Sequence, residues 1–146
     1  MQPIMGLNHP FGNPSLKRLL LTFVVFLFLA TASSAQASEL VRKFSGSRST
    51  ETAEFEVKAP WLVDWRVNSD FPSSMGIAVT LAYGGTGVHA GKVFKTKSPG
   101  NGLRLIEESG RFKFKVDAAI TNWTLKVIQL TPEEAELYKP KEKLDY

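Results

Sequence analysis

The chain has 146 residues, which is the length of a single domain. Hydrophobic residues make up 43% of it and charged residues 22%, a balance that excludes both a disordered tail and a multi-span membrane protein. The formal net charge is +4, and the chain contains no cysteine. The lack of cysteine excludes disulfide scaffolds, thiolate zinc sites and cysteine nucleophiles.

The first 37 residues have the order of a secretory signal. Residues 1–18 contain no acid and end in Lys17 and Arg18, residues 19–30 form an apolar run, and small residues then lead to Ala37. This order predicts a signal peptide over residues 1–37, cleaved after Ala37 or after Ala35. The alternative, a membrane anchor, is too short, because twelve helical residues span about 18 Å against roughly 30 Å of hydrocarbon. We therefore expect a secreted or periplasmic protein with no transmembrane anchor after cleavage.

Removing the predicted signal changes the charge balance. Residues 1–37 hold two of the 18 basic residues and none of the 14 acidic ones, so residues 38–146 keep a net charge of +2. A nearly balanced exported chain lacks the electrostatic footprint of a nucleic-acid-binding protein. We therefore expect no nucleic-acid partner.

Residues 38–130 show the period-two alternation of half-buried strands, separated by clusters of Gly, Pro, Ser and Asn. Residues 84–87, with three glycines, are a predicted turn, and residues 98–102 are a predicted loop. Seven or eight short strands at this spacing predict an all-β domain, an antiparallel β-sandwich with Greek-key-like connections. The predicted strands are residues 40–44, 52–57, 61–67, 77–83, 88–95, 103–108, 111–116 and 123–130.

A short helix is predicted after the last strand, within residues 131–146. Thr131 can cap the helix, Pro132 suits its first position and Glu134 completes a capping box. Pro140 stops the helix, and we expect residues 139–146 to fray.

Pairing arithmetic at the C-terminal end predicts a three-stranded meander. A two-residue loop at residues 109–110 pairs residues 103–108 with 111–116, and a longer loop pairs 111–116 with 123–130. Both pairings set apolar residues beside apolar residues, which a one-residue slip would destroy. A hairpin at residues 59–60 fails the same test, so we expect there a wider loop or a strand that crosses to the second sheet.

The same pairings gather five basic residues on one exposed sheet face, with Glu108 as the one acid. A solvated face kept soluble by lysines is one interpretation. The other is a docking surface for phosphate- or carboxylate-bearing polymers or for anionic lipid headgroups. The five residues are Arg104, Arg111, Lys113, Lys115 and Lys126.

Five motifs are spread along the chain after the predicted signal. They are F-S-G-S at residues 44–47, T-x-x-F-x-V at 52–57, P-W-L-V-D-W at 60–65, G-R-F-K-F-K-V at 110–116 and W-T-L-K-V at 123–127. Together they resemble the pattern of small secreted bacterial β-sandwich domains, which are mostly uncharacterised. The resemblance implies the fold and an exported location, and because its motifs are structural it implies no catalytic residue.

No set of residues has the spacing of a catalytic or metal site. His89 is the one histidine after the predicted signal and lacks a nearby acid, nucleophile or second metal ligand, so an ordinary strand-edge histidine is expected. The glycines of residues 85–91 are expected in a turn, because a strand pattern follows where a phosphate-binding loop would need a helix. We therefore expect no catalytic residue, no metal and no cofactor. Glycoside hydrolysis needs a pair of carboxylates, and no spacing in the sequence brings two of the candidate acids together. The candidate acids are Asp64, Asp70, Glu107, Glu108 and Asp117.

The three tryptophans have two interpretations. Trp61 and Trp65 share a strand face with valines, and Trp123 shares one with Leu125, which favours packing in the core. A flat aromatic platform that stacks on sugar rings is the alternative.

The sequence thus favours an exported, non-catalytic interaction module of the bacterial envelope or extracellular space. Its expected partner is an envelope or extracellular protein, an anionic polymer or a lipid surface. The alternative is a small secreted hydrolase or an enzyme inhibitor. A pocket with converging polar side chains would favour the hydrolase, and a sandwich with one charged face would favour the binding module.

Overall fold

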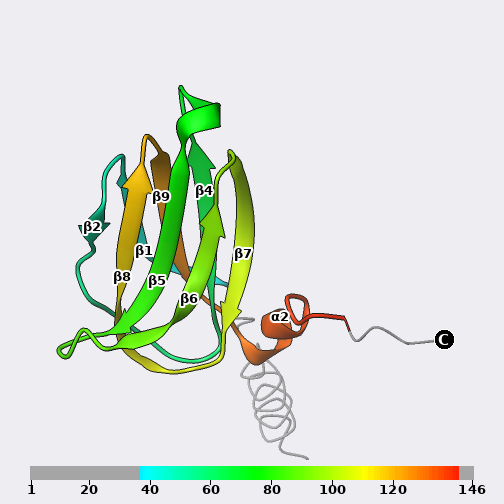
Figure 1. Cartoon of the computed structure of the whole chain (residues 1–146). Helices are drawn as coiled ribbons and strands as arrows, with labels where there is room; N and C mark the ends of the chain where they lie inside the picture. The colour runs from blue at the N-terminus through cyan, green and yellow to red at the C-terminus, as the bar shows by residue number, and fades with distance from the viewer. Residues whose placement is uncertain (1–36, 142–146) are drawn as a thin grey trace, which may run out of the picture. The chain divides into compact units, whose positions relative to one another are not determined.

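The computed structural model describes residues 37–141, which form nine strands, one 3-10 turn and one α-helix (Figure 1). All but the last position of the predicted signal peptide lies outside the described residues. No helix of the described range is long and apolar enough to cross a bilayer. The elements are β1 (Glu39–Gly46), β2 (Thr50–Glu51), β3 (Phe55–Val57), β4 (Trp61–Asn68), η1 (Pro72–Ser74), β5 (Gly76–Tyr83), β6 (His89–Thr96), β7 (Gly100–Ile106), β8 (Gly110–Ala119), β9 (Asn122–Gln129) and α2 (Pro132–Glu136).

The strands form two antiparallel sheets. Sheet A has the order β1-β9-β4-β7, and sheet B has the order β2-β8-β5-β6, with β3 following β2 along the same edge of β8. When β2 and β3 are counted as one interrupted strand, the orders become 1-8-3-6 and 2-7-4-5. This is the strand order of a jelly roll, a sandwich built from two Greek keys. The predicted antiparallel sandwich with a short C-terminal helix is confirmed.

The predicted meander is wrong, because β7, β8 and β9 alternate between the sheets. β7 pairs with β4, β8 pairs with β5, and β9 pairs with β1 and β4. Both inner faces of a sandwich are apolar, so an alternating strand matches partners in either sheet equally well. Within the described range only β5 and β6 are consecutive strands joined as a hairpin. Of the two alternatives expected at residues 59–60, the structure has the crossing to the second sheet, because β3 lies in sheet B and β4 in sheet A.

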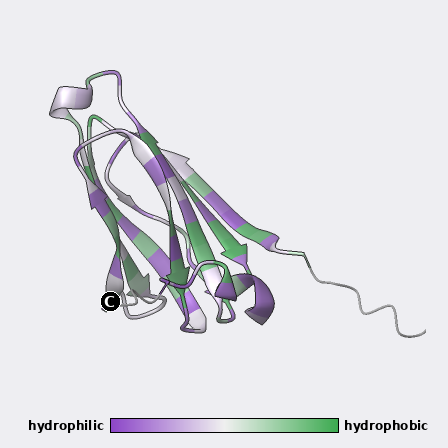
Figure 2. Ribbon diagram, turned by 90° about the vertical axis from the view of Figure 1, so that its right-hand side faces the viewer, coloured by the Kyte–Doolittle hydropathy of each residue, from purple (hydrophilic) through white to green (hydrophobic). Residues whose placement is uncertain are grey.

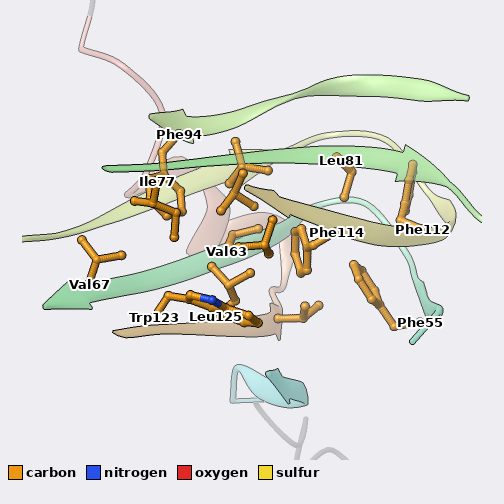
Figure 3. Close-up of a cluster of buried hydrophobic side chains, with 14 of the residues drawn as sticks. Phe55, Val63, Val67, Ile77, Leu81, Phe94, Phe112, Phe114, Trp123 and Leu125 are labelled. Carbon is orange, nitrogen blue, oxygen red and sulfur yellow. The ribbon is translucent and has the colours of Figure 1, made fainter. Parts of the chain in front are cut away.

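The core lies between the sheets and is built by every second residue of the central strands. Figure 3 shows side chains of both sheets pointing into this layer, among them Val63, Phe114 and Leu125, which have no exposed surface. Hydrophobic and hydrophilic residues alternate along the strands of Figure 2, as expected where one face of each sheet is buried. Burial of these apolar side chains is the main stabilising contribution to the fold.

A second, smaller apolar cluster lies on the outer face of sheet A. Leu62 of β4 and Leu130 are buried there against Ala135 of α2. The helix begins with the predicted capping box, in which Thr131 accepts from the Glu134 N–H and the Glu134 side chain accepts from the Thr131 N–H. The cap fixes the start of α2, and α2 in turn covers the cluster.

Candidate functional site

The outer face of sheet B carries three of the five predicted basic residues. Strand β8 buries every second residue between the sheets, from Phe112 to Val116. Alternation therefore turns Arg111, Lys113 and Lys115 to the outer face. For these three residues the prediction of a shared, outward-facing position holds.

Arg104 and Lys126 lie elsewhere, so the predicted five-residue face is wrong. Lys126 is on the outer face of sheet A, opposite Asp64 of β4. Arg104 pairs with the buried Val63, which places it on the inner side of the edge strand β7, with its side chain exposed. The error follows from the meander, which assigned three strands of two different sheets to a single sheet.

Strand β6 supplies cations that the sequence analysis did not assign to this face. Its register sets Lys92 opposite Thr80 and Lys95 opposite Ala78 of β5, and both lysines are exposed. His89 begins the same strand and is also exposed, as expected for a histidine at a strand edge. The basic surface therefore extends across β5 to the edge of the sheet.

A line of small side chains on β5 separates the two basic strands. Ala78 and Thr80 face outward between β6 and β8 and are partly exposed, whereas Ala82, on the same face, has no exposed surface. Because neighbouring strands are about 4.8 Å apart, the basic residues of β6 and β8 stand in rows roughly 10 Å apart. Two shallow hollows of about 190 and 520 Å³ lie on this face and share Ala78 and Asp117. We call this surface the lysine face; its cations are Lys92, Lys95, Arg111, Lys113 and Lys115.

The acids near the lysine face are Glu51 of β2, Glu54 before β3, and Asp117 of β8, which lines both hollows. The Lys113 Nζ donates to Glu51 Oε2 at 2.7 Å, and the Lys115 Nζ lies 3.9 Å from Glu51 Oε1. The hydrogen bond from Lys113, followed by the charge of that lysine, lowers the pKa of Glu51 below its ordinary value of 4.5. Among residues 37–141, neither Lys92 nor Lys95 has an ion-pair partner. The β6 side of the face therefore carries the uncompensated positive charge.

The glycine-rich turn between β5 and β6 folds toward β8. Gly85 and Gly87 have φ angles of 81° and 71°, a conformation that side chains disfavour. The Gly87 carbonyl accepts a hydrogen bond from the Lys115 Nζ at 3.0 Å, and the Gly85 N–H donates to Glu54 Oε1 at 2.8 Å. The predicted turn at residues 84–87 is thus confirmed, and it holds one end of the lysine face in place.

The tryptophans lie in the core rather than on a sugar-binding platform. Trp61 and Trp123 are buried between the sheets. Trp65 is half-buried and stacks on Phe94 with the ring centroids 4.0 Å apart. The prediction of core packing is therefore confirmed.

The carboxylates considered for hydrolysis are spread over the molecule. Asp64 lies on the outer face of sheet A, Asp117 lies on the outer face of sheet B, and Asp70 lies in the β4–β5 connection. Glu107 and Glu108 follow β7 and are exposed. In the part of the chain that the structure describes, no three His, Cys, Asp or Glu residues gather as a metal site.

Lys92 and Lys95 were missed because β6 does not alternate regularly. Its register with β5 shifts between Val79 and Thr80 and again between Leu81 and Ala82. Each shift inserts a residue, so the side-chain pattern of β6 loses its period of two. The glycine-rich turn was the signal that could have placed β6 beside β5, because such turns join paired strands.

Neither the fold nor the comparisons with known proteins identifies the function of this chain. A jelly roll hosts many unrelated functions, so function has to be argued from the surface rather than from the fold. The surface features of this chain are the lysine face and its uncompensated lysines on β6. In comparisons with known proteins, no family model matches the chain, and no curated protein matches it either.

Proposed function

We propose that the protein is an exported, non-catalytic binding module whose lysine face binds an anionic polymer of the bacterial envelope or extracellular space. The observation that carries the proposal is the arrangement of basic residues in two rows on either side of β5. Ala78 and Thr80, the partly exposed side chains between the rows, are small, so a polymer chain can approach the sheet closely at that point. The face offers several cations at once, which suits a partner with repeated negative charges.

The charge distribution supports an elongated ligand on the β5–β6 side. Glu51 already neutralises part of the charge of Lys113 and Lys115. Lys92 and Lys95 extend from the opposite row without such a partner among the described residues. Lysine ammonium groups are flexible point charges that suit phosphate or carboxylate groups without fixed geometry. Binding is therefore expected to be electrostatic and to weaken with added salt.

The exported location rests on the order of charged, apolar and small residues in positions 1–37. Sequencing of the N-terminus of the protein recovered from cells tests it. We expect the recovered chain to begin at Ser38, or at Gln36 if cleavage follows Ala35. Recovery of the intact chain from a membrane fraction would contradict the signal-peptide assignment.

Affinity measurements with polygalacturonate and with polyphosphate test the lysine face against a carboxylate and a phosphate polymer. In the double variant Lys92→Glu/Lys95→Glu we expect affinity to fall at least about tenfold, because two cations of the face become anions. The matched control is Lys43→Glu/Arg66→Glu, which makes the same change of net charge on the outer face of sheet A. We expect the control to bind within about twofold of the wild type.

Two outcomes would overturn the proposal. Equal losses in the two double variants would show that net charge, and not the lysine face, determines binding. Failure of the wild-type protein to bind either polymer at low salt would remove the proposed ligand class. Circular dichroism of each variant establishes that the fold persists, so that a loss of affinity is not a loss of structure.

A further inference from the structure

Large apolar side chains project from two connections at one end of the sandwich. Phe71, in the β4–β5 connection, is 65% exposed, and Ile120, in the β8–β9 connection, is 54% exposed. Pro72 follows Phe71 at the start of η1 and is also exposed. Figure 1 shows η1 protruding at the end of the sandwich opposite α2. We call Phe71, Pro72 and Ile120 the apolar tip.

A buried hydroxyl group connects the two loops that carry the apolar tip. Ser69 is 7% exposed, its Oγ donates to the Ile120 carbonyl, and it accepts from the Phe71 N–H at 3.0 Å. Thr121 is 2% exposed, and its hydroxyl lies 2.8 Å from the Ala119 carbonyl oxygen. Among the described residues, Ser69 and Thr121 are the two buried polar side chains. The hydrogen bonds of these two hydroxyl groups fix the conformation of the loops that carry the tip, so the tip is preorganised.

The backbone of Ile120 is held in an unfavourable conformation. Its φ of 50° is the one positive value among the non-glycine residues of the described range. A β-branched residue is a steric outlier in this region of φ, where Asn and Gly are accepted more readily. The Ile120 side chain adds little to the core because it is turned toward solvent. Strain retained at such a position is characteristic of a functional surface.

Cations flank the apolar tip on both sides. Arg48 precedes Ser49, whose hydroxyl accepts from the Ala118 N–H at 2.9 Å, two residues before Ile120. Lys97 follows Thr96 of β6, which pairs with Ile77 near the other loop. Two acids accompany these cations: Asp70 lies in the tip loop itself, and Asp117 accepts from the Ser49 Oγ at 3.3 Å and lines a hollow with Lys97. Arg48 and Lys97 thus lie in connections at the same end of the sandwich as the apolar tip.

We propose that the apolar tip inserts into the surface of an anionic lipid bilayer. Projecting apolar side chains on a convex end need an apolar phase that can deform around them, and the outer hydrocarbon of a bilayer is such a phase. Arg48 and Lys97 are then at the level of the headgroups, where they attract anionic lipid. Membrane binding of this kind combines buried apolar area with electrostatic attraction, and this end of the sandwich supplies both. The apolar residues of the tip are not part of the lysine face, although Lys97 lines the same hollow as Lys95.

Site-specific fluorescence tests insertion directly, because the chain contains no cysteine of its own. The variant Ser73→Cys places an environment-sensitive nitrobenzoxadiazole label beside Phe71 and leaves the tip residues intact. The control Glu133→Cys places the same label on α2, at the opposite end of the sandwich. The vesicles contain phosphatidylcholine and phosphatidylglycerol at a molar ratio of about 7:3, which approximates the anionic lipid content of a charged leaflet. We expect the fluorescence emission of the label to shift to the blue in Ser73→Cys and to stay unchanged in Glu133→Cys.

Two further variants separate insertion from simple charge attraction. Phe71→Ser and Ile120→Asn, each combined with Ser73→Cys, are expected to need at least about tenfold more lipid for the same shift, because each removes apolar surface. Ile120→Asn is also expected to unfold at the same or a higher temperature than the wild type, since Asn tolerates positive φ. Lys92→Glu, outside the hollow that Lys97 lines, leaves the tip unchanged and is expected to keep the shift.

The proposal is overturned by either of two results. The first is a Ser73→Cys label whose emission does not change with the anionic vesicles. The second is a shift that persists unchanged in both the Phe71→Ser and the Ile120→Asn backgrounds, which would show that the apolar side chains do not enter the lipid.

Discussion

Two tryptophans of sheet A lie directly over glycines of the neighbouring strands. Trp123 pairs with Gly46, and Trp65 pairs with Gly102. An added Cβ would be 2.7 Å from a ring carbon of Trp123 at Gly46, and 2.6 Å from a ring carbon of Trp65 at Gly102. The close approach of an indole ring therefore requires glycine at both positions.

Substitution of one of these glycines should cost stability. Trp65 cannot move away easily because its ring is stacked on Phe94, so we expect Gly102→Ala to lower the free energy of unfolding by about 1–3 kcal/mol. Gly100→Ala is the control, since Gly100 is two residues away on the same strand face and has open space around it. We expect it to be neutral or to stabilise by up to about 1 kcal/mol. Urea unfolding of both variants measures the difference, and equal effects would contradict the account of Trp65.

The ion pair of Glu51 should make stability depend on pH. The hydrogen bond and charge of Lys113 lower the pKa of Glu51 in the folded state, so its ionised form stabilises the fold above the ordinary value of 4.5. This stabilisation is lost as the pH falls through the folded pKa. We therefore expect the wild type to be more stable than Glu51→Gln at pH 7 and the difference to disappear in acid. Thermal unfolding of both proteins between pH 7 and pH 2 measures this difference in stability. A difference that grows on acidification would contradict a lowered pKa of Glu51 in the folded state.

At the scale of the elements, the C-terminal helix was predicted from three residues. Thr131, Pro132 and Glu134 determine where the helix begins, and the structure has the capping box at that position. Local signals suffice here because every partner lies within one turn. The helix is only five residues long, so its packing through Ala135 onto the second cluster is what stabilises it.

Removal of the cap should loosen the helix selectively. We expect Thr131→Ala to cost about 0.5–2 kcal/mol locally, because the Glu134 N–H loses its side-chain acceptor. Thr131→Ser keeps that acceptor and is the control. Amide hydrogen exchange measures the effect: the Ala135 and Leu137 N–H groups should exchange faster in Thr131→Ala, while the central strands are unchanged. Uniform acceleration throughout the sandwich would show instead that α2 is part of the global folding unit.

The sequence predicted the approximate location of the strands better than the residue at which each strand begins. Residues 98–102 were predicted as a loop because they are rich in Pro and Gly, yet β7 begins at Gly100. Position 102 of this strand requires glycine because the Trp65 ring of β4 occupies the space that a side chain would need. Such a requirement comes from another strand and cannot be recognised in the local sequence.

At the scale of the whole molecule, alternation predicted two packed sheets but not which strands are neighbours. Residues 111–116 matched both 103–108 and 123–130 as partners, although β8 lies in the opposite sheet from β7 and β9. Residues that face each other across a core and residues that pair within a sheet are equally apolar. The pattern therefore predicts a layered fold, and the connections between sheets decide the topology.

The surfaces of the whole molecule follow from that topology. Lys113 and Lys115 were found from the sequence because they alternate with phenylalanines on one strand. Lys92 and Lys95 join them only because β5 lies between β6 and β8, a long-range arrangement. The apolar tip likewise depends on Ser69, which links two loops that are far apart in the chain. Sites assembled across strands are thus the features that local patterns predict least well.

The central claim is that an anionic polymer binds across β5 on the lysine face. Titration of the isotopically labelled protein with oligogalacturonate, followed by amide chemical shifts at low salt, tests it most directly. We expect the largest shifts at Thr80, Lys92 and Lys115, with the outer face of sheet A, represented by Lys126, unaffected. The shifts should reverse on addition of salt. Largest shifts at Lys126 and its neighbours, or none at any residue, would contradict the claim.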